Sequence, residues 1–153
     1  MGSETSPDEL LEQARQEQHP RCIVCSEQHT CGLKVEYAAT DEGGVAATFE
    51  CLEQWQGYSG LVHGGVIASL LDGAMTNCLF AEGIVAYTAD LQVRYKRPLH
   101  VGTPAQVVAT VSRRNPPLFV LKSKIVQEGR VRAIATGMFM TNDNQLKQLW
   151  NGD

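Results

Sequence analysis

The longest apolar stretch of the chain predicts one buried helix. Residues 60–80 read GLVHGGVIASLLDGAMTNCLF, and apolar side chains occupy nearly every side of a helical projection. A helix that is apolar nearly all round is buried inside a protein. We therefore expect a helix from about His63 to Ala81, ended near Gly83, because glycine commonly follows the last turn of a helix.

Alternating apolar and polar positions predict strands on both sides of this helix. Two short runs precede it, with Asp41–Gly44 as the hairpin turn between them, and four runs follow it. The predicted strands cover residues 33–37, 45–50, 84–95, 105–112, 118–127 and 131–140. Strict alternation in the third of these strands places Leu91 and Val93 on one face and Thr88 on the other.

The order of these elements predicts an α+β domain in which a six-stranded antiparallel sheet curls around one central helix. A polar helix near the N-terminus, from about Ser6 to Gln18, is extra to this core. The expected organisation is an N-terminal helix with a cysteine-containing segment (1–31), one domain (32–141) and a polar tail with Trp150 (142–153). The sheet edge left open would suit a dimer.

Charge is distributed unevenly. The net charge of −4 argues against general binding of nucleic acid, yet residues 91–140 carry nine Lys or Arg and only one acid, Glu128. This basic half either binds a discrete anion or simply reflects long charged side chains on exposed strand positions. No apolar run approaches the roughly 20 residues that span a membrane.

Three of the five cysteines, Cys22, Cys25 and Cys31, lie within 13 residues that also hold His19 and His29. Their spacing is cramped compared with structural zinc sites, in which two ligand pairs are further apart. We expect a loop that packs small thiols onto the domain and no metal, with a zinc-holding interaction protein as the alternative. An odd number of cysteines behind a polar N-terminus predicts reduced thiols and a cytoplasmic protein.

Candidate chemistry lies at two points of the central helix. Gly64 and Gly65 allow close approach to the first backbone amides, which have no intrahelical partner and suit a developing oxyanion. Asp72 is the only charge between Glu53 and Glu82, and burial of a lone carboxylate raises its pKa unless donors stabilise it. His63 is nine residues from Asp72, too far along one helix for a dyad, so a dimer would have to bring the two ends together.

Each of these features also has a structural explanation. The glycines can serve close packing, a histidine at a helix start can be a cap, and a buried aspartate can be held by hydrogen bonds alone. The residues by themselves leave an active site and a purely structural role open.

The motif G-x-x-H-G-G-x6-D, Gly60 to Asp72, resembles the hotdog-fold thioesterases of the phenylacetic-acid-degradation (PaaI-like) type. The run TADLQVRYKRP, residues 88–98, resembles the strand that follows the helix in that family, and Cys22-x-x-Cys25 followed by Gly32-Leu33 resembles its N-terminal segment. The resemblance implies a hotdog homodimer or homotetramer that hydrolyses acyl-CoA thioesters without a metal or redox cofactor.

The resemblance also implies roles for individual residues. Asp72 would be the general base or nucleophile, the Gly64 amide would polarise the thioester carbonyl, and His63 would position the loop. Thr88 would orient the water or the carboxylate across the dimer. Substrate-binding residues would be Gly65, Arg94, Lys96 and Arg114, whereas Arg97 is a weaker candidate because neighbours on a strand face opposite ways.

This chain departs from the family pattern at two points. Many relatives have a side chain such as Glu or Asn where this chain has Gly73, and some place Asn or Gln upstream of the histidine, where Gln56 is the nearest residue. Related hotdog dehydratases use other His and acid arrangements that are not found here. The alternative to an enzyme is a non-catalytic hotdog module that binds acyl-CoA or lipid.

Overall fold

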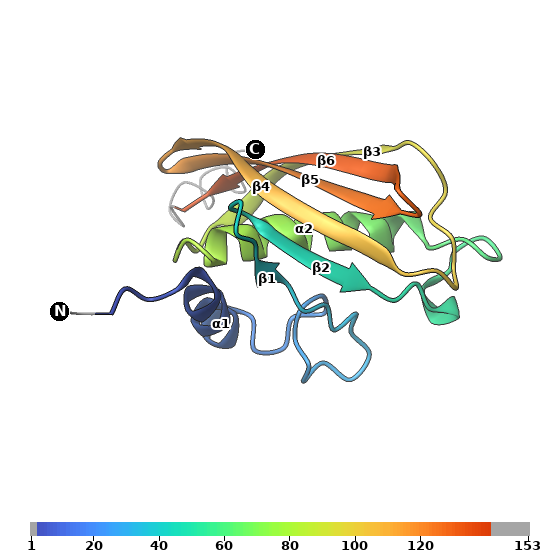
Figure 1. The fold of residues 1–153 in the computed structure, drawn as a ribbon, viewed down its shortest axis with the longest axis horizontal. Coiled ribbons are helices and arrows are strands. Elements are labelled where there is room, and N and C mark those ends of the chain that lie inside the picture. The colour runs from blue at the N-terminus through green and yellow to red at the C-terminus, as the bar shows by residue number, and fades with distance from the viewer. Residues whose placement is uncertain (1–2, 142–153) are drawn as a thin grey trace, which may run out of the picture.

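The computed structural model describes residues 3–141, and Figure 1 shows a sheet arched over one long helix. The helices are α1 (Pro7–Gln18) and α2 (Gly64–Phe80), with a short 3-10 helix η1 (Glu53–Trp55). The strands are β1 (Ala38–Ala39), β2 (Val45–Phe49), β3 (Tyr87–Tyr95), β4 (Ala105–Asn115), β5 (Leu118–Gln127) and β6 (Arg130–Met140).

All strand pairs are antiparallel, in the order β1-β2-β4-β5-β6-β3. β4, β5 and β6 follow one another as hairpins, whereas β3 reaches the far side of β6 and is an edge strand of the sheet. Strands β2 to β6 all contact α2, so one face of the sheet wraps around the helix. The predicted α+β architecture, with six strands around one central helix and an extra N-terminal helix, is confirmed.

Helix α2 begins and ends where the sequence predicted. The His63 side chain caps its first turn, Ala81 is the C-cap, and Gly83 follows with a φ of 72°. Leu70, Leu71 and several residues of its second half are fully or almost fully buried. Each such leucine contributes about 1.5–3 kcal/mol by leaving water, so the sheet and α2 hold each other in place.

Helix α1 is closed by a capping box between Ser6 and Glu9 and packs against α2 through Leu11 and Ala14. In Figure 1 α1 and the loop that follows it lie on the side of α2 opposite β3 to β6. His19 is the C-cap of α1, and the chain then runs along α2.

Residues 33–37 do not form the predicted strand, although their alternation of burial was read correctly, since Val35 and Tyr37 are buried. Their backbone pairs with the preceding loop instead: the Leu33 and Val35 amides donate to the carbonyls of residues 23 and 24 at 2.7 and 2.8 Å. Lys34 has a φ of 52°, which interrupts any ladder, so β1 is reduced to Ala38–Ala39.

The strand predicted from residue 84 begins only at Tyr87, because Ile84 still donates its amide to the Leu79 carbonyl at the end of α2. The predicted polar tail, with Trp150, lies outside the described residues.

Candidate active site

The first turn of α2 leaves the backbone amides of Gly64 and Val66 without a hydrogen-bond partner among residues 3–141. The His63 Nδ1 accepts a hydrogen bond from the Gly65 amide at 2.8 Å, so the Gly65 donor is satisfied by the cap. The Gly64 amide has no hydrogen-bond partner among residues 3–141. It is also at the positive end of the helix dipole, which favours binding of negative charge at this point.

Tyr95, a residue that the sequence analysis missed, fixes this helix start against the sheet. Its hydroxyl donates to the Gly64 carbonyl at 2.7 Å from the last position of β3. Tyr95 also lies 3.5 Å from the position that a Gly64 side chain would occupy. The one sequence signal for it was its place beside the basic residues that end the predicted strand.

The loop before α2 is closed by backbone contacts and by Gln56. The Gln56 side-chain oxygen accepts from the Gly60 amide at 3.1 Å, and the His63 amide donates to the Trp55 carbonyl at 2.9 Å. Gly57 packs on the His63 ring, where a side chain would come within 3.0 Å. Gln56 therefore shapes the loop, and His63 positions the first turn of α2.

A cavity of about 690 Å³ opens beside the first turn of α2. Its walls come from the loop before α2, from the start of the helix and from the segment after β3. The lining residues are Gly57, Tyr58, Leu61, Val62, His63, Gly64, Ile67, Tyr95, Lys96, Arg97, Pro98 and Leu99. Lys96 and Arg97 both line it, because β3 ends at Tyr95 and strand alternation no longer applies to the residues that follow.

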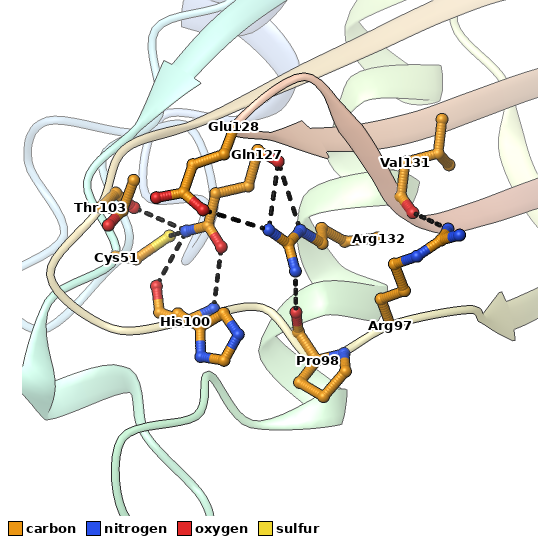
Figure 2. A network of polar contacts seen from close by, with 9 residues as sticks. All are labelled: Cys51, Arg97, Pro98, His100, Thr103, Gln127, Glu128, Val131 and Arg132. Atoms are coloured by element: carbon orange, nitrogen blue, oxygen red, sulfur yellow. Dashed lines mark hydrogen bonds and ion pairs between the residues drawn. The ribbon is translucent and has the colours of Figure 1, made fainter.

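The segment that forms this cavity wall is held from behind by a network of polar contacts, shown in Figure 2. The buried Arg132 guanidinium donates to the Pro98 carbonyl at 3.1 Å and to the Gln127 carbonyl at 3.3 Å. The Gln127 side chain donates in turn to the carbonyls of His100 and Thr103. Arg132, one of the nine basic residues, therefore serves the loop and not a ligand.

Asp72, in the middle of α2, is held by Thr88 of the same chain. The Thr88 hydroxyl donates to the Asp72 Oδ1 at 2.8 Å. The family resemblance implies that Thr88 acts across a dimer, and strict alternation places Thr88 on the face of β3 opposite Leu91. A bulge between Thr88 and Asp90 inserts Ala89 into the strand and brings Thr88 onto the face toward α2.

The surroundings of Asp72 favour a protonated carboxyl more than water does. Burial raises the pKa of Asp72, and the hydrogen bond from Thr88 partly opposes that rise. The charges of Cys22 and His19 act on it as smaller influences in opposite directions. A carboxylate with a raised pKa is a stronger base than an exposed aspartate, which suits proton transfer.

The missing side chain at Gly73 has a packing reason. A Cβ at this position would lie 2.6 Å from the Val24 Cγ1 and 3.1 Å from the Tyr37 hydroxyl. Tyr37 itself donates to the Leu70 carbonyl at 2.8 Å. The segment after α1 thus lies directly on α2 beside Asp72, and a larger residue at 73 would push it away.

The two candidate elements are separated within one chain. Gly64 and Asp72 are eight residues apart on α2, about 12 Å along the helix axis. Of the predicted substrate-binding residues, Lys96 lies at the cavity, and Arg94 is exposed on the outer face of β3. Arg114 lies beyond the opposite end of α2 in a two-pronged ion pair with Glu82.

In the cysteine-containing segment, the residues that lie together differ from those that the sequence spacing groups. The structure brings Cys22 and Cys25 together with His19, whereas His29 accepts the Cys31 amide at 3.2 Å apart from that group. All five cysteines are free thiols. The pKa of Cys22 is lowered because the neighbouring Cys25 thiol donates to its thiolate, and that sharing raises the pKa of Cys25.

A curved antiparallel sheet wrapped around one long helix, with backbone donors at the helix start and a carboxylate along it, defines a hotdog-fold protein. The family model of the thioesterase superfamily matches residues 59–134, from the loop before α2 into β6. The chain belongs to this superfamily, in agreement with the resemblance in its sequence.

Known proteins agree with this assignment. The acyl-coenzyme A thioesterase THEM4 of Rattus norvegicus is 41% identical over 71 residues, which cover 44% of this chain and 30% of that protein. The chain spans less than half the length of the curated relatives it matches, with 48% for the THEM4 of Bos taurus.

Among solved structures, a thioesterase superfamily protein is 26% identical, with a TM-score of 0.74 over 77% of this chain and 62% of that chain. The E. coli PaaI protein from the phenylacetic acid degradation operon is 23% identical, with a TM-score of 0.66 over 71% and 83%. A Streptococcus mutans protein bound to acetyl CoA is 19% identical, with a TM-score of 0.66 over 71% and 88%. At these last two identities the likeness shows the fold alone.

Proposed function

We propose that this protein is an acyl-CoA thioesterase that releases a free carboxylic acid and coenzyme A. The observation that carries the proposal is the half-buried Asp72 carboxylate, held by Thr88 in the middle of an otherwise apolar helix. The pKa of Asp72 is raised, which favours a base that activates water and is not needed for a purely structural aspartate. The curated relatives named acyl-coenzyme A thioesterases support the substrate class.

In the proposed reaction, the carbonyl oxygen of the thioester accepts a hydrogen bond from the free Gly64 amide. Asp72 takes a proton from water as the water oxygen attacks the carbonyl carbon, and the amide stabilises the resulting oxyanion. When the tetrahedral intermediate collapses, the carbon–sulfur bond breaks, and the leaving thiolate takes the proton from Asp72. Thr88 orients the carboxylate through its hydroxyl.

A second route uses Asp72 as the nucleophile and passes through a mixed anhydride that water then opens. A single turnover in water enriched in heavy oxygen detects the nucleophilic route when water opens the anhydride at the Asp72 carbonyl carbon, because heavy oxygen then enters the Asp72 carboxylate. Trapping of the anhydride with hydroxylamine detects the same route when water attacks the substrate acyl carbon, whereas the general-base route labels only the released acid and forms no anhydride.

The proposed coenzyme A site is the basic mouth of the cavity beside α2. Lys96 and Arg97 line this cavity and can pair with phosphates, and the acetyl CoA bound to the Streptococcus mutans relative supports this ligand class. Arg94 and Arg114 stay predicted substrate-binding residues. For Arg114 the proposal requires that its pair with Glu82 open or that it serve another subunit.

The proposed active unit is a homodimer, or a dimer of dimers. Gly64 and Asp72 are too far apart on one helix to meet the same thioester, so each must face its counterpart in a second subunit. Edge strand β3 supports this assembly, because it carries the exposed aromatic residues Tyr87 and Tyr95. A strictly monomeric protein in solution would contradict the proposed site.

The decisive experiment compares hydrolysis of an acyl-CoA panel, aliphatic and aromatic, by the wild type and by Asp72→Asn. We expect kcat to fall by roughly 10²–10⁴-fold, the usual contribution of a general base. Asp41→Asn, the same change in an exposed turn, should keep full activity. Equal rates for wild type and Asp72→Asn would remove Asp72 from the mechanism, and tight binding without turnover by the wild type would identify a binding module.

The same variant provides its own folding control. Because the pKa of Asp72 is raised in the folded protein, ionisation at neutral pH opposes folding. Asp72→Asn should therefore melt at a higher temperature than the wild type at neutral pH. The difference should shrink below the ordinary aspartate pKa, where both side chains are neutral in the folded and unfolded states.

The proposed location is the cytoplasm, in keeping with five free thiols. No helix among residues 3–141 is long and apolar enough to cross a bilayer. The proposed hydrolysis uses no cofactor, and the division at residues 31/32 and 141/142 stays a prediction.

A further inference from the structure

The segment that joins α1 to the domain holds a cluster of metal-ligand side chains that the proposed hydrolysis does not use. Within the described part of the chain, His19, Cys22 and Cys25 are the group of His, Cys, Asp or Glu residues whose ligand atoms all lie within 4.8 Å of one another. Imidazole and thiolate are the ligands that zinc prefers in proteins.

The geometry of the cluster suits a tetrahedral ion. With Zn–S bonds of about 2.3 Å and Zn–N bonds of about 2.0–2.1 Å, the sulfur and nitrogen ligands of a tetrahedral site lie about 3.5–3.6 Å apart. The Cys25 Sγ and the His19 Nδ1 are 3.6 Å apart. We propose that His19, Cys22 and Cys25 bind one zinc ion and that a water molecule takes the fourth position.

The groups around the cluster already hold the ligands in place. The His19 ring packs edge-on against Phe80, with ring centroids 5.0 Å apart, and the Cys22 sulfur accepts the Val24 amide at 3.3 Å. The Arg15 guanidinium donates to the Cys25 carbonyl at 2.8 Å, which fixes the turn between the two cysteines. Such surrounding contacts orient metal ligands and strengthen binding.

A buried polar atom on α2 lies near the cluster. Asn77 is fully buried one turn before Phe80, its amide donates to the Gly73 carbonyl at 2.8 Å, and its side-chain oxygen has no hydrogen-bond partner among residues 3–141. An unpaired buried carbonyl costs stability unless another donor, such as metal-bound water, meets it. On the other side, His19 lines an open cavity of about 400 Å³ through which an ion can arrive.

The sequence spacing alone favoured a different ligand set. His29 and Cys31 complete the pattern C-x2-C-x3-H-x-C, yet Cys31 is exposed and bonds locally with His29 and Thr30. His19 precedes the cysteines in the spacing H-x2-C-x2-C, and the C-cap of α1 turns it back over them. The zinc ion would join the end of α1 to the loop that follows it, and Val24 of that loop packs against Gly73 of α2.

The test is zinc uptake by the reduced, chelator-stripped full chain in competition with a chromogenic chelator. We expect one zinc per chain, and Co²⁺ in its place should give thiolate-to-cobalt charge-transfer and tetrahedral ligand-field bands. Cys22→Ser and Cys25→Ser should each weaken zinc binding by roughly a hundredfold or more, since each removes a direct ligand. The matched controls Cys31→Ser and His29→Ala should bind as the wild type does.

A second readout uses the wild type alone and does not depend on folded variants. Zinc should protect the half-buried Cys22 from alkylation and leave the exposed Cys31 reactive, as mapped on peptides by mass spectrometry. Less than stoichiometric uptake, protection of Cys31 instead, or loss of binding in the Cys31→Ser control would each overturn the proposal. Neither readout measures hydrolysis of acyl-CoA, so the zinc proposal can fail or hold independently of the proposed activity.

Discussion

The start of α2 and its middle offer two different kinds of chemistry. At the start, the useful group is the Gly64 amide, which belongs to the backbone and is positioned by His63 and Tyr95. In the middle, the useful group is the Asp72 side chain, which burial and Thr88 tune. A backbone donor survives almost every substitution of its own residue, whereas a side-chain base is lost with a single one.

The largest effect at the helix start should come from a residue without an amide hydrogen. Gly64 is the first helical residue, where proline is tolerated, and His63 has a ψ of 137°, which a following proline allows. Gly64→Pro should lower kcat by roughly 10²–10³-fold, the usual result of losing an oxyanion donor. Gly64→Ala keeps the amide and, with Tyr95 no closer than 3.5 Å, should stay active; similar losses in both variants would refute the amide role.

A mixed dimer tests whether the two points of α2 act across subunits. Asp72→Asn and Gly64→Pro, each with its own affinity tag, are co-expressed and the heterodimer is isolated. One site of the heterodimer then combines an intact Asp72 with an intact Gly64, so we expect about half of the wild-type activity per dimer from two inactive parents. Background activity in a stable heterodimer would show that both groups must come from one chain.

Thr88 tunes the base and should give an intermediate effect. Thr88→Val removes the donor that lowers the pKa of Asp72, so that pKa should rise further. The acid limb of the kcat/KM profile should move to higher pH, and kcat should fall roughly tenfold as the carboxylate loses its orientation. Thr88→Ser keeps a hydroxyl and should restore the limb; an unmoved limb in Thr88→Val would separate Thr88 from the titrating group.

Tyr95 should give the smallest effect. Tyr95→Phe removes one hydrogen bond to the Gly64 carbonyl and keeps the ring, at a cost of about 1 kcal/mol in a half-exposed position. We expect a few-fold loss in kcat/KM and a slightly lower midpoint in urea. Tyr87→Phe, an exposed tyrosine at the other end of β3, is the matched control and should change neither quantity.

Patterning predicted the large elements because burial determined them. The apolar run around Asp72 becomes a buried helix, and the alternating runs after it become β3 to β6. The order of the elements then indicated the architecture, because a helix buried on all sides needs a sheet that curves around it.

The contacts of the site depend on details that alternation does not carry. The bulge at Ala89 turns Thr88 toward Asp72, and no residue type in that strand predicts a bulge. Arg114 and Glu82 pair across 32 positions of sequence, a proximity that only the finished fold creates. The spacing C-x2-C-x3-H-x-C leaves out His19, because the cap at the end of α1 brings its ring to the cysteines.

Behind the cavity wall, the residues that hold the loop backbone differ from the residues that line the cavity. Arg132 and Gln127 grip backbone carbonyls of the loop, so they hold its path whatever side chains it carries. Lys96 and Arg97, in contrast, line the cavity and hold none of these loop carbonyls, although Arg97 donates to the Val131 carbonyl of β6 at 3.3 Å. Substitutions at residues 96 and 97 can therefore change which ligands this cavity wall binds, while Arg132 and Gln127 continue to hold the path of the loop.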